Sequence, residues 1–298
     1  MTIMTAGSKH YVLAEGPQFN PDGRSVSWVD IEACTIQVAQ LHDQSRLEVV
    51  RTITLQDRVG GAFPLADGRF LAGIGSRLGI VDAQGSVRLS RELLRPGRRF
   101  NDGIIDPAGR LIIGGMSLAG PHEGNVLLRL EHDGSITTLD DDLQLSNGMG
   151  FSPDGLTFYL VDSLAHVVYA RDYDAQSGVT GPRRVLARVD DAEPDGMAVD
   201  DEGDLWVALW GGGGIRRFGP GGASKGDIAI GVPHVTSLCF LGTGPLEAGR
   251  GLALVTTASL VLTESERREY PDAGRVFVVE LGALAPSASR WVEVSLPA

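Results

Sequence analysis

Four oxygen-bearing side chains of this sequence stand at one fixed distance before a turn. Turns that end in glycine recur along the chain, with the glycines at Gly23, Gly68, Gly109, Gly155 and Gly203. Counting back eight residues from each of them leads to Glu15, Gly60, Asn101, Asn147 and Asp195. A more diverged sixth copy fits best with Thr236 in this position. Equal spacing from a turn gives equal positions in a repeated unit, so the four polar side chains are predicted to point at one place.

The chemistry of this set is that of a cation site. Glycine follows each polar residue, directly or after one further residue (EGP, NDG, NGM, DGM), and leaves room for a ligand beside the backbone. Two carboxylates and two amides offer only oxygen atoms, which suit a hard divalent cation. Calcium is the first expectation; magnesium and manganese are possible, and zinc is less typical with such ligands. Taken singly, the same residues could cap strands or form Asx turns.

A repeat along the chain accounts for the equal spacing. The turn glycines are 45, 41, 46 and 48 residues apart. In each copy a short apolar strand precedes the turn, and a strand rich in β-branched and aromatic residues follows it, as in TFYLVDS from 157. A third strand (TIQVAQL from 35) and a fourth (RRVLARV from 183, RVFVVEL from 275) complete the unit. Four short strands per repeat of this length are typical of a β-propeller blade.

We therefore predict an all-β fold, a six-bladed β-propeller with four antiparallel strands per blade and a metal in the central channel. The innermost strand of each blade runs along that channel, so the four polar side chains would meet near its axis. Residues 1–13 are expected to add a strand to the last blade and close the ring, which removes free strand edges. Since one period runs through the sequence, residues 1–298 are predicted to form a single domain.

Composition argues against several partner classes. The 298 residues carry a formal charge of −12 without a Lys/Arg cluster, so nucleic acid and anionic membranes are poor partners. No apolar run approaches ~18 residues, and the N-terminus lacks the basic and apolar segments of a signal peptide. Cys34 and Cys239 are expected to be buried free thiols in a reducing compartment. These features predict a cytoplasmic protein and leave its oligomeric state open.

Several motifs, in order along the whole chain, resemble the regucalcin (senescence marker protein)/gluconolactonase/luciferin-regenerating-enzyme family. They include AEGPQF from 14, WVDI from 28, RRFNDGIIDPAGR from 98, SNGMGFSPDG from 146 and PDGMAVDDEGDLWVALWGGG from 194. The resemblance implies a six-bladed propeller with one divalent metal in its channel. The metal ligands of the family match Glu15, Asn147 and Asp195. The Arg and Asn of its R-x-N-D-G motif, which contact substrate, match Arg99 and Asn101.

The chain also departs from the family pattern. Phe19 and Phe151 stand where Trp is usual, which we interpret as a change in core packing. Ala119 stands where some members have an acidic residue that binds sugar hydroxyls. His122 or Glu123 could replace it from a different loop position. These departures leave the sugar preference open.

The resemblance implies hydrolysis of a lactone, typically an aldonolactone, by attack of water on a metal-polarised carbonyl. Asp195 is the candidate general base, with metal ligation alone as the alternative. Arg99 offers paired donors for substrate oxygens or a product carboxylate, and Asn101 would hold a hydroxyl. Two other functions compete with this hypothesis: hydrolysis of another ester or an organophosphate, and a calcium-binding propeller without catalysis.

Other polar residues carry weaker signals. Asp102 is interpreted as support for its turn, and Asp162 as a structural hydrogen-bonding group. His166 and His234 could line the channel mouth. Trp210 and the glycines at 211–214 stand where a blade loop could face the pocket, although such a glycine run more often marks a flexible turn. Neither a G-x-S-x-G segment nor a Ser-His-Asp arrangement is visible, so covalent acyl transfer is not expected.

Overall fold

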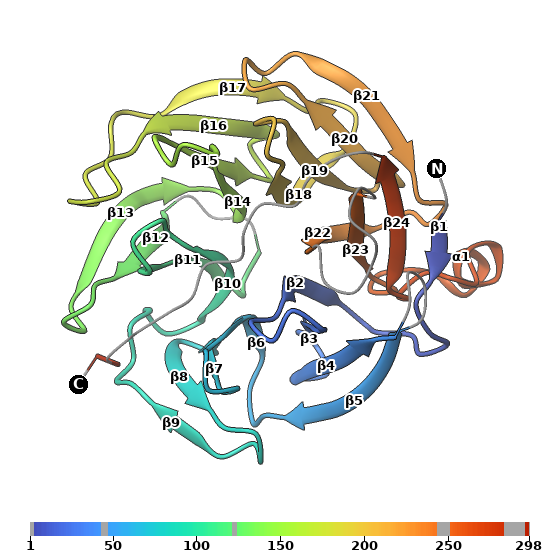
Figure 1. Cartoon of the computed structure of the whole chain (residues 1–298), viewed down its shortest axis with the longest axis horizontal. Coiled ribbons are helices and arrows are strands. Elements are labelled where there is room, and N and C mark those ends of the chain that lie inside the picture. Colours follow the sequence, from blue (N-terminus) through green and yellow to red (C-terminus); the bar gives the residue numbers. More distant parts are fainter. Residues whose placement is uncertain (1–2, 43–46, 121–123, 243–250, 283–295, 298) are drawn as a thin grey trace.

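A computed structural model describes residues 3–42, 47–120, 124–242, 251–282 and 296–297 of the chain. In this described part, six four-stranded antiparallel sheets stand around a central axis (Figure 1). The six-bladed β-propeller predicted from the repeat is thereby confirmed.

The first five blades follow the chain, each with four consecutive strands that run from the axis outward. The first blade consists of β2 (Ala14–Phe19), β3 (Ser25–Asp30), β4 (Thr35–Leu41) and β5 (Leu47–Thr54), and the second of β6 (Val59–Pro64), β7 (Phe70–Ile74), β8 (Arg77–Val81) and β9 (Val87–Leu89). The third consists of β10 (Arg98–Ile105), β11 (Leu111–Ser117), β12 (Asn125–Leu130) and β13 (Ile136–Leu143), and the fourth of β14 (Ser146–Phe151), β15 (Thr157–Asp162), β16 (Val167–Asp172) and β17 (Arg184–Arg188). The fifth consists of β18 (Glu193–Val199), β19 (Leu205–Trp210), β20 (Gly214–Phe218) and β21 (Ser224–Ala229).

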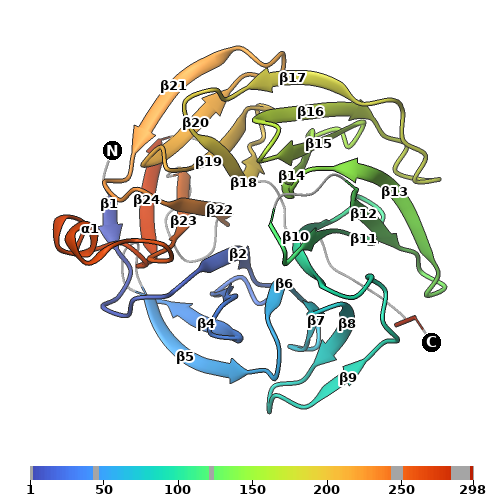
Figure 2. The same cartoon turned by 180° about the vertical axis from the view of Figure 1, so that it is seen from behind.

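The sixth blade joins the two ends of the chain. Its strands, from the axis outward, are β22 (Val235–Leu241), β23 (Gly251–Thr257), β24 (Phe277–Gly282) and β1 (Ile3–Thr5). The pairing of β1 with β24 places Met4 opposite Val278, and Figure 2 shows the two strands side by side. The prediction that the N-terminal segment closes the ring is confirmed. The prediction that residues 275–281 form the fourth strand of their repeat is wrong, because β1 takes that outer place and leaves β24 third.

One short helix, α1 (Glu264–Glu269), lies in the connection between β23 and β24. Thr263 and Glu266 form a capping box at its start, which satisfies the first backbone N–H groups. None of its residues is buried, so the helix lies on the surface of the sixth blade and does not contribute to the core. Among the described residues, no helix is long and apolar enough to cross a membrane.

The hydrophobic core lies between neighbouring blades. Each of the six blade-to-blade contacts has its own cluster of buried apolar side chains in the described chain. Phe63 and Phe100 pack between the second and third blades. Phe151 and Phe158, with ring centroids 5.0 Å apart, pack between the third and fourth. Phe151 is therefore a core residue, and burial of each such side chain stabilises the fold by about 1.5–3 kcal/mol.

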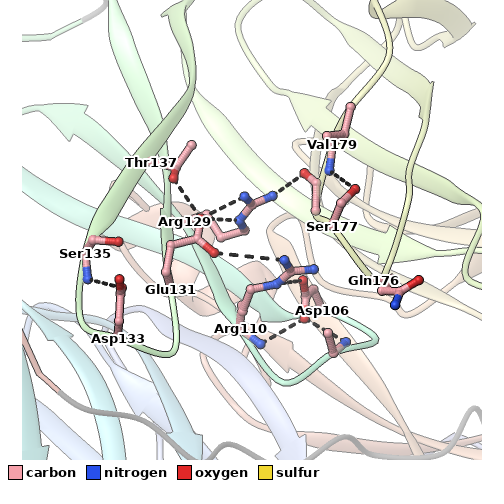
Figure 3. Close-up of polar contacts among 12 residues, drawn as sticks. Asp106, Arg110, Arg129, Glu131, Asp133, Ser135, Thr137, Gln176, Ser177 and Val179 are labelled. Atoms are coloured by element: carbon pink, nitrogen blue, oxygen red, sulfur yellow. Dashed lines mark hydrogen bonds and ion pairs between the residues drawn. The ribbon is translucent and has the colours of Figure 1, made fainter.

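A buried ionic network also joins the third and fourth blades (Figure 3), and we call it the blade 3–4 network. Asp106 is fully buried and accepts hydrogen bonds from the backbone N–H groups of Ala108 and Arg110, both at 2.8 Å. The Nε of Arg110 pairs with the same carboxylate at 2.6 Å, and the hydroxyl of Tyr173 donates to it. Beside it, Arg129 pairs with Glu131 at 2.7 Å. This network links the two blades through ion pairs and hydrogen bonds between their own side chains.

Candidate functional site

The innermost strand of every blade is irregular at the position that lies eight residues before the turn glycine, or at its equivalent in the sixth blade. Its register with the second strand shifts there, as in a β-bulge, which breaks the normal alternation and re-aims a side chain. The shifts lie between Glu15 and Gln18, Val59 and Gly61, Phe100 and Gly103, Ser146 and Met149, Pro194 and Met197, and Val235 and Ser237. The spacing read from the sequence thus corresponds to a backbone feature at one end of the channel. We call the face on this side the front face.

The glycines that follow two of these positions have a different role from the one expected. A Cβ on Gly148 would lie 2.5 Å from the backbone oxygen of Asp195, and one on Gly196 would lie 2.7 Å from the Cα of Ser237. Side chains cannot be accommodated at such distances, so these residues allow neighbouring innermost strands to touch. The space that we assigned to a ligand is filled by backbone from the next blade.

The carboxylates of Glu15 and Asp195 are buried close to one another. Their residues are 7% and 6% exposed, and neither forms an ion pair within the described chain. Burial raises the pKa of Glu15 to about 8, and the nearby carboxylate of Asp102 adds to this shift. Burial likewise raises the pKa of Asp195 well above its usual range, with further increases from Glu15 and Asp102. Both shifts reflect negative charge gathered in a dry place, and the guanidinium of Arg99 offsets only part of the pKa shift of Glu15.

Asn147 lies against Asp195 and has an oxygen without a partner. Its Nδ2 donates to Oδ1 of Asp195 and to Oγ of Ser163, the latter at 3.2 Å. Its Oδ1 is buried and accepts no hydrogen bond from the described residues. A buried acceptor is normally satisfied, so this atom points to a missing ligand. Ser163, which orients the amide, was not singled out from the sequence; its place in the VDS segment is its only sequence signal.

Asn101 is satisfied by the chain itself. Its Nδ2 donates to the backbone oxygen of Ser146 at 3.0 Å, which ties β10 to β14. Its Oδ1 accepts from Nη1 of Arg99 at 2.8 Å. Asn101 therefore differs from Asn147, although both occupy the same position in their blades. This difference separates the two amides as the resemblance does, with Asn101 outside the candidate ligand set.

Arg99 is a buried cation without a carboxylate partner. It is 7% exposed, and Nη1 donates to the backbone oxygen of Phe100 and to Asn101. No ion pair links its guanidinium to a carboxylate of the described residues, although Glu32 and Glu15 lie close enough to stabilise its charge. Burial nevertheless lowers its pKa to about 10, so it remains charged near neutral pH. Its remaining N–H groups are suited to an oxygen-rich or anionic ligand.

Behind these residues the channel continues as a cavity of about 340 Å³ toward the rear face. Asp102, Met149, Met197 and Phe240 are among its lining residues, whereas Glu15, Asn101, Asn147 and Asp195 are not. Oδ1 of Asp102 accepts from the backbone N–H of Gly103 at 2.7 Å, so Asp102 supports the bulge of β10 and not the turn that follows the strand. Burial raises its pKa to about 6. The bulge thus separates Asn101, which faces Arg99, from Asp102, which lines the rear cavity.

The residues at the axis fit a divalent cation. The two buried carboxylates repel one another, and the amide oxygen beside them has no hydrogen-bond donor. A cation bound to all three groups would neutralise the negative charge and give the amide oxygen a partner. The described chain holds no group of three or more His, Cys, Asp or Glu side chains arranged for a metal. The candidate set instead combines two carboxylates with an amide, and all its donor atoms are oxygens.

Two of the weaker candidates have structural roles. Asp162 accepts from the backbone N–H groups of Gln144 at 3.0 Å and Leu145 at 2.9 Å, which confirms its interpretation as a structural group. Nδ1 of His166 lies 2.9 Å from the backbone oxygens of Val189 and Ala192. Because both partners are acceptors, Nδ1 must carry the proton, and the ring holds two loops together.

Other candidates have mixed outcomes. The rings of Trp210 and His234 stack on the front face, with centroids 4.1 Å apart. Ala119 is exposed, and His122 and Glu123 lie outside the described residues. Both cysteines are free, as expected, but both are only half-buried, so the expectation of buried thiols is wrong. Cys239 lines the rear cavity, and burial raises its thiol pKa to about 12.

Comparison with known proteins identifies the family of this chain. The family model described as SMP-30/Gluconolactonase/LRE-like region matches residues 13–258. The chain belongs to this family. It is 33% identical to pentonolactonase XacC of Haloferax volcanii over 250 residues, and this aligned region covers 81% of this chain and 82% of that protein. It is 31% identical over 274 residues to regucalcin of Danio rerio, which covers 90% of both chains.

A solved structure shares the same architecture. The chain superposes on a calcium-binding protein, regucalcin, from Agrobacterium tumefaciens with a TM-score of 0.87 and 25% identity, over 97% of each chain. The family resemblance inferred from the motifs is confirmed. The chain is thus a member of a lactonase-like family whose relatives include a pentonolactonase.

Proposed function

We propose that this protein is a metal-dependent lactonase that opens a small sugar lactone to its acid. The observation that carries the proposal is the partnerless Oδ1 of Asn147 beside the buried carboxylates of Glu15 and Asp195. Membership in the lactonase-like family and the pentonolactonase relative support the substrate class. The calcium-binding regucalcin of similar fold supports a divalent cation, with calcium as first choice.

Glu15, Asn147 and Asp195 would hold the cation, each through an oxygen atom. When bound, such a cation supplies a Lewis acid for the lactone carbonyl oxygen and a water of lowered pKa. Asn147 is pre-oriented for this role because its Nδ2 is occupied by Asp195 and Ser163, which leaves Oδ1 as its free atom.

Asp195 would also serve as general base. Oδ1 accepts from Asn147, whereas Oδ2 accepts no hydrogen bond from the described residues. Oδ2 can take the proton of a water that attacks the lactone carbonyl carbon, and can return it to the ring oxygen as the ester bond breaks.

Arg99 and Asn101 would bind the substrate at the front of the site. The unused N–H groups of Arg99 can donate to a lactone hydroxyl or to the carboxylate of the product. Asn101 fixes one edge of the guanidinium through its Oδ1. A protein that only stores calcium has no need of a buried, unpaired guanidinium at this place.

The test is acid release from a panel of aldono-1,4-lactones, aldono-1,5-lactones and uronolactones, followed with and without a chelator. We expect turnover of at least one sugar lactone, its loss on chelation and its recovery with calcium or another divalent cation. A phosphotriester substrate in the same panel distinguishes the organophosphate alternative. Binding of a cation at the site, measured by calorimetry, without turnover of any lactone would overturn the proposal.

A further inference from the structure

Two aromatic side chains from different blades are stacked at the front face. Trp210 ends β19, and His234 lies in the connection that enters β22. Their ring centroids are 4.1 Å apart, the planes differ by 20°, and the two residues also form an isolated backbone bridge. Both residues are half-buried. The stack is therefore a fixed part of the front face that remains partly open.

This stack lies beside the candidate metal centre. Trp210 is paired in register with Glu193, two residues before Asp195. His234 stands two residues before Thr236, which occupies the sixth equivalent position. Trp210 also packs against the cluster that contains Leu13, two residues before Glu15. The stack thus lies where the front ends of β18, β19 and β22 meet, at the same end of the channel as Asp195 and the sixth equivalent position.

The ring nitrogens of His234 form no hydrogen bond with the described residues. Its Nδ1 is buried and has no partner among the described residues, whereas Nδ1 of His166 contacts two backbone oxygens. A buried N–H without an acceptor is rarer than a buried acceptor without a donor, so the proton belongs on Nε2. Burial lowers the pKa of His234, which keeps the ring neutral near pH 7. The free N–H donor of this ring is consequently at its Nε2 edge.

An aromatic pair with a free N–H donor is chemically suited to a sugar ring. Sugar rings present C–H groups on one face and hydroxyls around their edge. An aromatic wall contributes area and dispersion contacts at low entropic cost, and one polar atom sets orientation. The acidic residues and Arg99 nearby recognise only oxygens, so they leave the apolar face of such a ligand without a partner.

We propose that Trp210 and His234 form the wall that positions the sugar ring of the substrate over the candidate metal centre. The open edge of the stacked pair lies against C–H groups of the lactone, and Nε2–H of His234, which lies in the plane of its ring at that edge, donates to a ring hydroxyl. This inference rests on the proposed lactonase function and assigns two further substrate-positioning residues to that site. It also assigns part of the sugar preference, which sequence comparison with the family left open, to blades 5 and 6.

The test compares Trp210→Ala, Trp210→Phe, His234→Ala and His234→Gln with a matched control, Tyr169→Ala. Tyr169 also forms a stack, with Arg183 at 5.0 Å, but on the fourth blade away from the channel. With the lactone that the wild type turns over fastest, we expect Trp210→Ala to raise KM about 10-fold, the size typical of one lost aromatic stack, while kcat and metal content stay near wild type. Trp210→Phe and His234→Gln should recover part of the loss, and Tyr169→Ala should have no effect.

A second measurement separates this inference from the lactonase proposal. D-Gluconate, a sugar acid product, is titrated into the calcium-loaded proteins by calorimetry. If the wild type binds D-gluconate and the alanine variants bind it more weakly, the wall is supported even where no lactone is hydrolysed. Lactone turnover with wild-type KM in both folded Trp210→Ala and folded His234→Ala would overturn the wall and leave the lactonase function intact. Neither turnover nor D-gluconate binding by the wild type would overturn both.

Discussion

The candidate metal centre and the blade 3–4 network both bury charged side chains, but they satisfy them to different degrees. In the network, Asp106 accepts from two backbone N–H groups, from Nε of Arg110 and from Tyr173. At the centre, the amide of Asn147 is the one donor to Asp195 among the described residues, and the oxygen of that amide accepts nothing from them. Complete satisfaction makes a buried network rigid, whereas a deficit of one sign costs free energy until a ligand supplies the missing charge.

This contrast separates stability from function in one molecule. The network should stabilise the fold and be silent in catalysis, because every charge has its counterpart in the chain. The centre should do the reverse, since its carboxylates destabilise the metal-free protein and become useful when a cation binds. Substitutions in the two regions should therefore produce opposite patterns.

The largest effect is expected from Asp195→Asn. It removes a ligand charge and the candidate base, and turnover should fall by about 1,000-fold or more. The free energy of unfolding of the chelator-treated variant should equal or exceed that of the wild type, because a buried negative charge is lost. Activity assays measure the turnover, and denaturant unfolding measures the free energy of unfolding. The control is Asp162→Asn, which removes a structural hydrogen-bond acceptor and should lower the free energy of unfolding while turnover is retained. Turnover by Asp195→Asn close to that of the wild type would contradict the role assigned to Asp195.

The next effect concerns stability alone. Asp106→Asn removes the closer carboxylate partner of the buried Arg110 and leaves Glu131, 3.9 Å away, as the other, so the free energy of unfolding should fall by about 3 kcal/mol, the low end for a broken buried pair. Turnover per folded molecule should not change below the unfolding midpoint. If Asp106→Asn altered metal affinity or KM, the two regions would be coupled and the contrast would be wrong.

Arg99→Ala probes the substrate side of the centre. Loss of charge-assisted hydrogen bonds should raise KM about 10- to 100-fold. Metal content, measured by calorimetry or elemental analysis, should be that of the wild type, because the guanidinium contacts Asn101 and not the candidate ligands. A variant that no longer binds the cation would show that Arg99 belongs to the metal shell.

The smallest effect is a pH dependence of the metal-free protein. Burial raises the pKa of Glu15 to about 8, above that of the unfolded chain, so the folded state binds its proton more tightly. This stabilisation is fully present below the ordinary carboxyl pKa and is lost as pH rises toward 8. The thermal midpoint of chelator-treated protein should therefore be lower at about pH 8 than at about pH 5. Glu15→Gln should weaken this dependence, and an unchanged slope in that variant would assign it to other groups.

Much of the fold could be predicted from the sequence. Turn glycines at a regular period and strands with β-branched residues predicted six blades, because four short strands are the unit that such a period can form. The place of residues 275–281 could not be predicted, because a strand's neighbours are decided by pairing between distant segments. The helix Glu264–Glu269 was also missed, since it is short and buries no side chain.

The candidate site could likewise be predicted from the sequence only in part. The eight-residue spacing brought Glu15, Asn101, Asn147 and Asp195 together, since equal offsets mean equal places in equivalent strands. The spacing could not distinguish the two amides. Only the structure shows that Asn101 is satisfied by Arg99 and Ser146, whereas Asn147 keeps a free oxygen.

The sequence by itself thus determined the repeat, the ring and the residue types at its axis, because these follow from local spacing and turn chemistry. Only the tertiary structure decided which polar atoms have partners. Hydrogen-bond satisfaction depends on groups that are far apart in the chain, such as the Nδ2 of Asn147 and the carboxylate of Asp195. The stack of Trp210 on His234 has the same origin, since it forms where two blades meet at the front of the channel.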